Sequence, residues 1–184
     1  MQIQFVEKIK QRVGDYFFKR DLKFNDRKRI VHNFQSAKSI GVLYDATDLK
    51  DMLMVSEFVN ELFHSKKEIK ALGFVNKNEL SHNHIPMLQF DFFFLKDLNW
   101  FYKPQNYVIN NFLEKDYDIL INLCTQNCVP VKYLAGSSRA KFKVGKLEDN
   151  TSVYDMMIDV KQNSLETLIK EVKHYLNLIN TNGK

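Results

Sequence analysis

Polar side chains follow two apolar segments of this sequence, and their types suit the binding of a small ligand. Asp45 and Thr47 come after one segment, and Asn122 and Thr125 lie near the end of another and just beyond it. If both segments are strands of an open parallel sheet, these residues lie at the carboxyl ends of the strands, where such sheets bind ligands. Alternatively, these carboxylates have only local structural roles: Asp45 makes contacts within its own loop, and Asp48 caps the next helix.

A second group of candidates lies in the turn 136–141. Gly136 and Ser137 offer backbone and hydroxyl donors, and the Arg139 guanidinium can form paired hydrogen bonds with a phosphate or a carboxylate. A helix end at Gly136 followed by an ordinary turn explains the same residues. From both groups we predict a site for a small anion of the phosphate or nucleotide type. Its candidate residues are Asp45, Thr47, Asn122, Thr125, Ser137, Ser138 and Arg139.

No other arrangement in the sequence indicates catalysis or a cofactor. Neither a Gly-x-Gly-x-x-Gly motif after an apolar segment nor a Walker A motif occurs, and no nucleophile is spaced with a base. His82 and His84 lie in a polar loop, where we expect exposed side chains and no metal site. Cys124 and Cys128 are expected to be buried or half-buried thiols, and neither metal ligands nor a redox pair. We therefore predict no cofactor and favour a non-catalytic protein over an enzyme.

Alternating strands and helices are predicted to position these candidates. Short apolar segments alternate with segments of helical period, a pattern typical of βαβ units and a parallel sheet. The alternation of polar and apolar residues in 140–145 favours an edge strand. We expect a three-layer, Rossmann-like α/β domain with a mainly parallel sheet of five or six strands. Strands are predicted at 40–44, 69–75, 88–95, 118–123, 140–145 and 154–160, and helices at 49–65, 105–115, 130–136 and 165–179.

The N-terminal segment carries the excess positive charge. Residues 1–38 contain ten Lys or Arg and four Asp or Glu, whereas the rest of the chain contains 17 and 18. Residues 2–22 have the period of an amphipathic helix, whose apolar face comprises Phe5, Val6, Ile9, Val13, Tyr16, Phe17 and Leu22. We therefore divide the chain into a basic amphipathic helical segment, 1–38, and an α/β domain, 39–180. The candidate contacts to an anionic partner are Lys8, Lys10, Arg12, Lys19, Arg20, Lys23, Arg27, Lys28 and Arg29.

Three roles are open for this segment. It could contact the phosphates of RNA, a ribosome included, it could lie on the anionic inner surface of a membrane, or it could simply pack on the domain. The aromatic residues 100–102, between Lys96 and Lys103, leave a similar choice between stacking on bases and packing. We favour a non-catalytic binding or adaptor protein attached through residues 1–38, with a small-ligand enzyme or sensor as the alternative.

Composition and targeting signals predict a cytoplasmic location. With 45% hydrophobic residues, 15 Phe and only three Pro, the 184-residue chain has the composition of one folded domain and not of a disordered protein. No apolar segment reaches the ~18–20 residues that span a bilayer, and the N-terminus lacks a signal-peptide pattern. Two cysteines fit a reducing compartment. The basic segment is also compatible with a peripheral position at the inner membrane.

The stretches 38–47 (KSIGVLYDAT), 117–123 (YDILINL) and 135–145 (AGSSRAKFKVG) are similar to those of an uncharacterised family. This family is a Bacteroidota domain of unknown function, found in small cytoplasmic Rossmann-like proteins. The resemblance covers nearly the whole chain and implies the fold, but no known activity. A weaker resemblance links 117–123 and 143–145 to the N-terminal half of heptosyltransferase-like glycosyltransferases. It implies the same topology only, because those enzymes need a second domain to hold a nucleotide-sugar.

Overall fold

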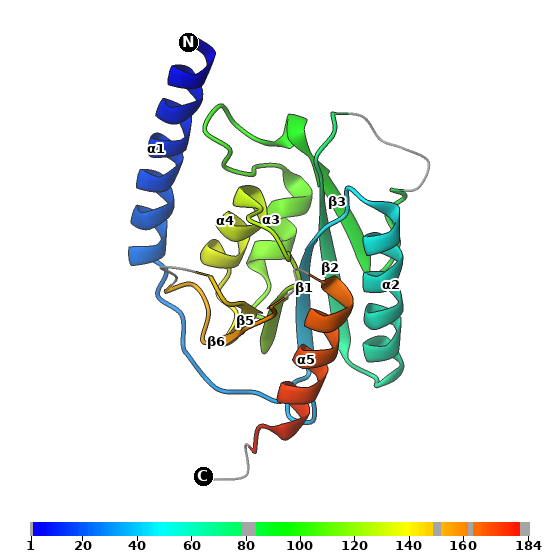
Figure 1. Cartoon of the computed structure of the whole chain (residues 1–184). Helices are drawn as coiled ribbons and strands as arrows, with labels where there is room; N and C mark the ends of the chain where they lie inside the picture. The colour runs from blue at the N-terminus through cyan, green and yellow to red at the C-terminus, as the bar shows by residue number, and fades with distance from the viewer. Residues whose placement is uncertain (1, 79–83, 149–151, 162–163, 181–184) are drawn as a thin grey trace.

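The computed structural model describes residues 2–78, 84–148, 152–161 and 164–180, with the backbone alone for residues 2–8 and 11 (Figure 1). Within these ranges the chain forms a six-stranded sheet with helices on both faces. The strands are β1 (Ser39–Asp45), β2 (Glu68–Val75), β3 (Phe90–Phe94), β4 (Ile119–Asn122), β5 (Phe142–Lys146) and β6 (Met156–Ile158). The helices are α1 (Gln2–Lys23), α2 (Leu49–His64), α3 (Tyr107–Glu114), α4 (Val129–Ser137) and α5 (Leu165–Leu178), with a 3-10 turn at Leu95–Asp97.

The strands lie in the order β3-β2-β1-β4-β5-β6, and every pair is parallel. Val42 of β1, for example, pairs with Ala71 of β2 on one side and with Ile121 of β4 on the other. This is the strand order of the Rossmann fold, and it reverses between β1 and β4. The predicted fold class is therefore confirmed, with a sheet that is parallel throughout.

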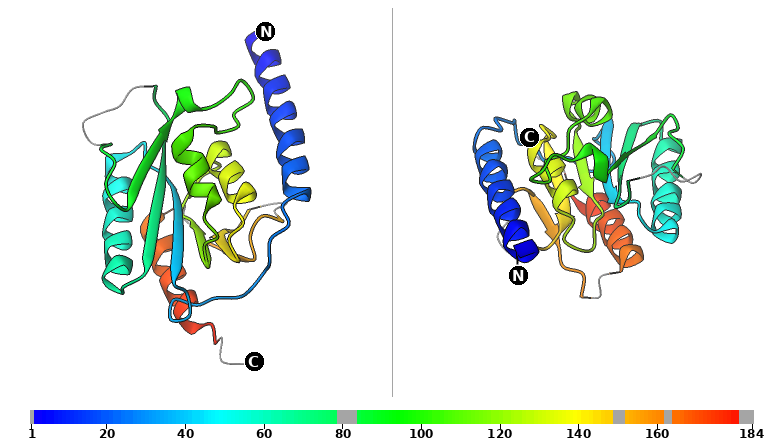
Figure 2. Two further views of the ribbon diagram at one scale, coloured as in Figure 1. Left: turned by 180° about the vertical axis from the view of Figure 1, so that it is seen from behind. Right: turned by 90° about the horizontal axis from the view of Figure 1, so that it is seen from above.

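Two hydrophobic clusters join the sheet to its helices. Ile40 and Val42 pack in a cluster with α2 and α5, whereas Leu43 and Leu120 pack on the opposite face with α3 and α4. Successive side chains of a strand point to opposite faces, so the central strands bury both of theirs. Figure 2 shows the resulting three layers, with α1 outside α4 at the margin of the molecule.

The position of β5 differs from the prediction. It is not an edge strand, because it pairs with both β4 and β6, and the edges are β3 and β6. Its alternation comes from lysines with partners inside the fold. Lys143 is only 1% exposed, and its Nζ donates to Gly136 O at 3.2 Å, while Lys141 Nζ donates to Asp118 Oδ1 at 2.7 Å. Burial, followed by repulsion from Arg27, lowers the pKa of Lys143 to about 7.

The N-terminal helix forms as predicted, but only part of its predicted apolar face, including Phe17 and Leu22, packs against the domain. Phe18 and Leu22 pack against the domain, whereas Ile9 and Tyr16 are 41% and 65% exposed. Apolar side chains therefore lie on two sides of α1. A helical period by itself does not show which of the two sides is buried.

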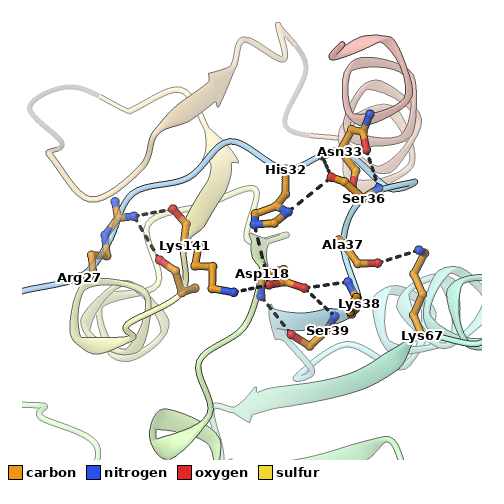
Figure 3. Close-up of polar contacts among 11 residues, drawn as sticks. Arg27, His32, Asn33, Ser36, Ala37, Lys38, Ser39, Lys67, Asp118 and Lys141 are labelled. Atoms are coloured by element: carbon orange, nitrogen blue, oxygen red, sulfur yellow. Dashed lines mark hydrogen bonds and ion pairs between the residues drawn. The ribbon is translucent and has the colours of Figure 1, made fainter. Parts of the chain in front are cut away.

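Residues 24–38, called the strap below, lead from α1 across the amino edge of the sheet (Figure 3). Arg27 holds its first half, because Nη1 donates to Ala140 O and Lys141 O, both at 3.1 Å, and Nη2 donates to Asp155 Oδ1 at 2.8 Å. Its last turn is held by Asn33, whose Nδ2 donates to the carbonyl of Ile179 at 2.8 Å. The strap is thus attached to the domain at both ends.

Asp118, just before β4, receives the end of the strap (Figure 3). Its Oδ2 accepts from Lys38 N at 2.7 Å and from Ser39 N at 3.3 Å, and its Oδ1 accepts from Lys141 Nζ. His32 Nε2 lies 3.8 Å from the same Oδ1. Burial raises the pKa of Asp118, but the hydrogen bond from Lys141 and those from the two amides outweigh it, so the pKa is lowered.

Candidate ligand-binding site

A cavity of about 890 Å³ opens at the carboxyl edge of the sheet, where the strand order reverses between β1 and β4. Its walls are the loops after these strands, the first turns of α2 and α4, and the inner side of α1. Sheets of this type bind ligands at this position, and pockets for small molecules have volumes of about 300–1,000 Å³. The position and the size of the cavity both suit a ligand.

The loop after β1 brings three carboxylates to one end of the cavity. Asp45 Oδ1 accepts from Thr47 N at 2.9 Å, and Thr47 Oγ1 accepts from Asn76 N at 2.8 Å. Asp48 caps α2 as predicted, and its Oδ1 accepts from Asp51 N at 3.3 Å. Burial raises the pKa of Asp51, and the neighbouring Asp48 and Asp45 add to this effect. The first turn of α2 therefore already lies beside the negatively charged carboxylates of this loop.

The loop after β4 is positioned by Asn122, which is 3% exposed. Its Nδ2 donates to the Tyr154 hydroxyl at 2.6 Å, and its Oδ1 accepts from Cys124 N at 3.0 Å. Both ends of the amide are thus engaged within the protein. Thr125 does line the cavity, and its carbonyl accepts from Lys146 Nζ at 2.8 Å. Asn122 therefore shapes the cavity wall, while Thr125 is available to a ligand.

Two glycines allow α1 to lie close enough to form a wall of the cavity. A Cβ at Gly14 of α1 would lie 2.7 Å from Phe101 O, and a Cβ at Gly136 of α4 would lie 2.6 Å from the Phe18 ring. Carbon atoms in contact are normally about 3.5–4.0 Å apart, so a side chain at either position would push α1 outwards. Gly14 is unfavourable within a helix by ~1 kcal/mol. Its close contact with the domain accounts for its presence.

Asp21 attaches the same helix to the domain through its carboxylate. Oδ2 accepts from Lys103 Nζ at 2.8 Å and from the Tyr133 hydroxyl. The Phe18 ring packs on Tyr133 with a centroid distance of 5.5 Å. Burial raises the pKa of Asp21, but the hydrogen bonds from Lys103 and Tyr133 outweigh it, so the pKa is lowered. These contacts make α1 part of the cavity wall.

The lining of the cavity is more acidic than basic. Its charged residues are Asp15, Lys19, Asp45, Asp48, Asp51 and Lys132. One of the two cations, Lys132, is paired with Glu148 at 2.7 Å. Tyr44 also lines the cavity, and its buried hydroxyl has no hydrogen-bond partner in the described part of the chain. This hydroxyl is enclosed beside Gly73 of β2, where an added Cβ would lie 3.0 Å from it.

The seven ligand-binding candidates do not converge on one site. Asp45, Thr47 and Thr125 line the cavity, and Asn122 supports it from behind. Ser137 ends α4, and Ser138 and Arg139 lie between α4 and β5, at the amino edge of the sheet. There Ser138 is fully buried and its Oγ accepts from Ala140 N at 3.1 Å, while Arg139 pairs with Asp116. A loop that enters a parallel strand lies at the edge opposite to a loop that leaves one.

The nine candidate cations also occupy different environments. Arg12, Lys19, Lys23, Lys28 and Arg29 are exposed, whereas Lys10 is half-buried and the side chain of Lys8 lies outside the described part. The Arg27 side chain is 5% exposed and holds the strap, as described above. Arg20 is paired with Asp21 at 3.1 Å and lies over the Phe17 ring. Arg29 Nε also lies 3.8 Å from Asp155 Oδ1, so four of the nine, Arg12, Lys19, Lys23 and Lys28, are exposed without an ion pair among the described residues.

In the described part of the chain, the aromatic loop 100–102 and His84 make contacts that stabilise the fold. Phe101 stacks on Phe17 of α1 with a centroid distance of 4.9 Å, so this ring packs between elements, while Trp100 is 59% exposed. His84 is buried, not exposed as predicted, and its Nε2 lies 2.9 Å from Ala46 O. His82 lies outside the described residues. Hydrogen bonding to Ala46 explains the burial of His84.

Ser36, His32 and Asp118 lie in the order of a catalytic triad, but their contacts are those of a turn. Ser36 Oγ lies 3.4 Å from His32 Nδ1, while it accepts from Asn33 N at 3.1 Å and donates to Asn33 O at 3.3 Å. The 3.8 Å between His32 and Asp118 exceeds a hydrogen bond. Asp118 is already engaged by Lys141 and two amides. We assign these residues to the attachment of the strap.

Two features of the site were not predicted from the sequence. One is the contribution of α1, which provides Asp15 and Lys19 to the lining. The other is the grouping of Cys124 and Cys128, which both line the cavity and pack in the same apolar cluster. The short spacing between the two cysteines in the sequence was a signal for their grouping. No local pattern in the sequence indicated that α1 lines the cavity.

Among the residues that the structure describes, membrane-spanning helices and metal-binding groups are both absent. No helix there is long and apolar enough to cross a bilayer. No three side chains of His, Cys, Asp or Glu there are grouped to hold a metal ion.

The parallel sheet, its strand order and the cavity at the reversal define a Rossmann-like α/β protein. The chain belongs to the Family of unknown function (DUF6913), whose model matches residues 10–179. This match includes most of α1, the strap, the whole sheet and α5. No curated protein and no solved structure matches the chain. The resemblance to a domain of unknown function is thereby confirmed.

Proposed function

We propose that this protein binds a small polar ligand in the cavity between β1 and β4. The observation that carries the proposal is the position of this cavity, at the reversal of strand order and beneath α1. Binding of a small ligand was the alternative in the sequence analysis, and we now favour it over the adaptor role, whether or not the protein is an enzyme.

The charges of the lining favour a neutral or positively charged ligand over the phosphate-type anion expected from the sequence. A Rossmann-type pyrophosphate site uses the free amides at the start of the helix after β1. In this protein the Asp48 carboxylate accepts from the first amides of α2, and Asp45 and Asp51 lie beside it. A phosphate at this position would meet three carboxylates and would have to compete with Asp48 for the amides of Lys50 and Asp51. Amines and polyhydroxylated compounds suit the site better.

A thermal-shift screen of the purified protein tests this proposal. We expect an amine, nucleoside or sugar to raise Tm at millimolar concentration, because a ligand that binds only the folded state stabilises it. Asp45→Asn should weaken that ligand about tenfold, since it removes one charge-assisted contact. Asp116→Asn is the matched control, because this carboxylate is exposed at the amino edge. The absence of a shift with every class would contradict ligand binding, and a shift with phosphorylated compounds alone would contradict the ligand class.

A second role, attachment to an anionic partner through residues 1–38, is supported by the outer side of α1. Its exposed cations Arg12 and Lys23 lie near Tyr16, which is 65% exposed, and Phe24, which is 75% exposed. Exposed aromatic and basic residues together suit RNA, a ribosome included, or the inner surface of a membrane. Figure 1 shows α1 at the margin, where it could cover the cavity and meet a partner. Both roles fit the cytoplasmic location expected from the sequence.

Sedimentation with ribosomes and with anionic vesicles tests this second role. Replacing Arg12, Lys23 and Lys28 together by Gln should reduce co-sedimentation at least tenfold, because each lost cation removes a phosphate contact. The control replaces the exposed Lys50, Lys161 and Lys170 by Gln, which changes the net charge equally. RNA binding should also fall steeply with salt. Equal losses in both variants would exclude a specific role for the N-terminal segment.

A further inference from the structure

The two cysteines of the chain meet at the wall of the cavity. Cys124 follows β4 and is 5% exposed, while Cys128 is the N-cap of α4 and is half-buried. Both are free thiols that line the same cavity and pack in the same apolar cluster, and the Cys128 thiol is near enough to raise the pKa of the Cys124 thiol. This grouping arises because the loop turns back from the end of the strand to the start of the helix. The sequence-based expectation was of buried or half-buried thiols that do not act as a redox pair, and the burial of both agrees with its first part.

We propose that Cys124 and Cys128 form a reversible intrachain disulfide, with a low-molecular-weight disulfide such as glutathione disulfide as the oxidant. Cys128 gives its proton to solvent and attacks one sulfur of the oxidant, whose S–S bond breaks and releases one small thiolate. Cys124 then loses its proton and attacks Cys128 Sγ, and the second small thiolate leaves. The protein loses two electrons and two protons in total, and the oxidant is reduced to two thiols.

The environments of the two thiols assign the order of these steps. The neighbouring Cys128 thiol, followed by burial, raises the pKa of the Cys124 thiol. Since the thiolate is the nucleophile, Cys124 is a poor first attacker, and an external oxidant reaches the half-buried Cys128 more easily. Once Cys128 carries the small thiol, the neighbouring Cys124 attacks within the same molecule. Such an intramolecular step needs no second collision and is favoured over a second external thiol.

The disulfide would change the shape of the cavity wall. Cys124 is tied to Asn122 through its amide, and Cys128 begins α4, so closing the bond draws the loop after β4 towards the first turn of this helix. Thr125 lies between the two cysteines and lines the cavity. Oxidation therefore reaches the candidate site directly. The disulfide itself does not depend on the identity of a ligand, so it can be tested separately.

The test equilibrates the full chain with glutathione buffers, blocks free thiols with N-ethylmaleimide in denaturant, and measures the intact mass. In oxidising buffer the wild type should lose two hydrogens and take up no maleimide, and dithiothreitol should reverse the change. Cys124→Ser should keep a glutathione adduct on Cys128, because the resolving thiol is missing. Cys128→Ser should stay unmodified, because Cys124 is buried.

Three results would overturn the proposal: a wild type that keeps both thiols free, one that keeps a lasting glutathione adduct, or one that forms disulfide-linked dimers instead. Circular dichroism checks that both Ser variants are folded, and Cys124→Ala and Cys128→Ala replace any variant that is not. The intact mass of the wild type is measured without any variant, so it tests disulfide formation even if a variant does not fold. A ligand found by thermal shift has no bearing on this mass.

Discussion

Replacing Asp118 by Ala should lower the free energy of unfolding by about 3 kcal/mol at neutral pH. This carboxylate accepts from two backbone amides and from Lys141, and its side chain is only 10% exposed. Its removal leaves the amides of Lys38 and Ser39 without their acceptor at the start of β1. Urea unfolding followed by circular dichroism measures the loss. Asp116→Ala is the matched control, because that side chain is 62% exposed and its pair with Arg139 contributes ~0–1 kcal/mol.

The contribution of Asp118 to the free energy of unfolding should also depend on pH. The pKa of Asp118 is lowered in the folded protein, whereas the unfolded chain has the ordinary value of about 3.9. Its contribution is therefore fully present above the unfolded pKa and is lost as the pH falls through the folded pKa. The difference between wild type and Asp118→Ala should shrink below about pH 4. Equal stabilities of the Asp118 and Asp116 variants at neutral pH would contradict this account of the strap.

Lys143→Met should stabilise the protein by about 1–3 kcal/mol at pH 7. The amine is buried in the second strand from the edge of the sheet and has the carbonyl of Gly136 as its acceptor. That carbonyl keeps a donor in the variant, because Asn25 Nδ2 also donates to it at 2.6 Å. Met has a similar length and no charge to desolvate. Thermal and urea unfolding measure the gain, with exposed Lys170→Met as the control that should change little.

The sign of the pH effect at Lys143 is opposite to that of a paired lysine. Burial lowers its pKa from 10.5 to about 7, so between these values the unfolded chain binds a proton that the folded chain does not. Stability therefore rises with pH across this window in the wild type. The advantage of Lys143→Met should be greatest at pH 7 and below, and should disappear above about pH 10.5. An advantage that stays constant from pH 7 to 10 would show that the amine is charged in the folded state.

Local patterns were sufficient for the elements but not for all of their ends, since the strand predicted at 154–160 covers only Met156–Ile158. Asp48 was predicted to cap α2, and either Asn163 or Ser164 to cap the last helix. Asp48 and Ser164 are the caps, and each side-chain oxygen accepts from a backbone amide in the following turn. The nearly continuous apolar runs of β1, β2 and β4 predicted burial on both faces, and all three are interior strands. The edge assignment of β5 failed because alternation also arises when a lysine is buried against a carbonyl. Local sequence does not carry the partner of such a side chain.

The sequence alone determined that the chain is an α/β protein with a parallel sheet, because strand and helix periods are local properties. It also placed Asp45, Thr47 and Thr125 in loops that leave strands. Only the tertiary structure decided that Ser137, Ser138 and Arg139 lie at the other edge, and that α1 closes the cavity. Asp21 and Tyr133, for example, are 112 residues apart and meet only when the helices dock. Contacts between such distant residues depend on the packing of whole elements, for which no spacing in the sequence is a signal.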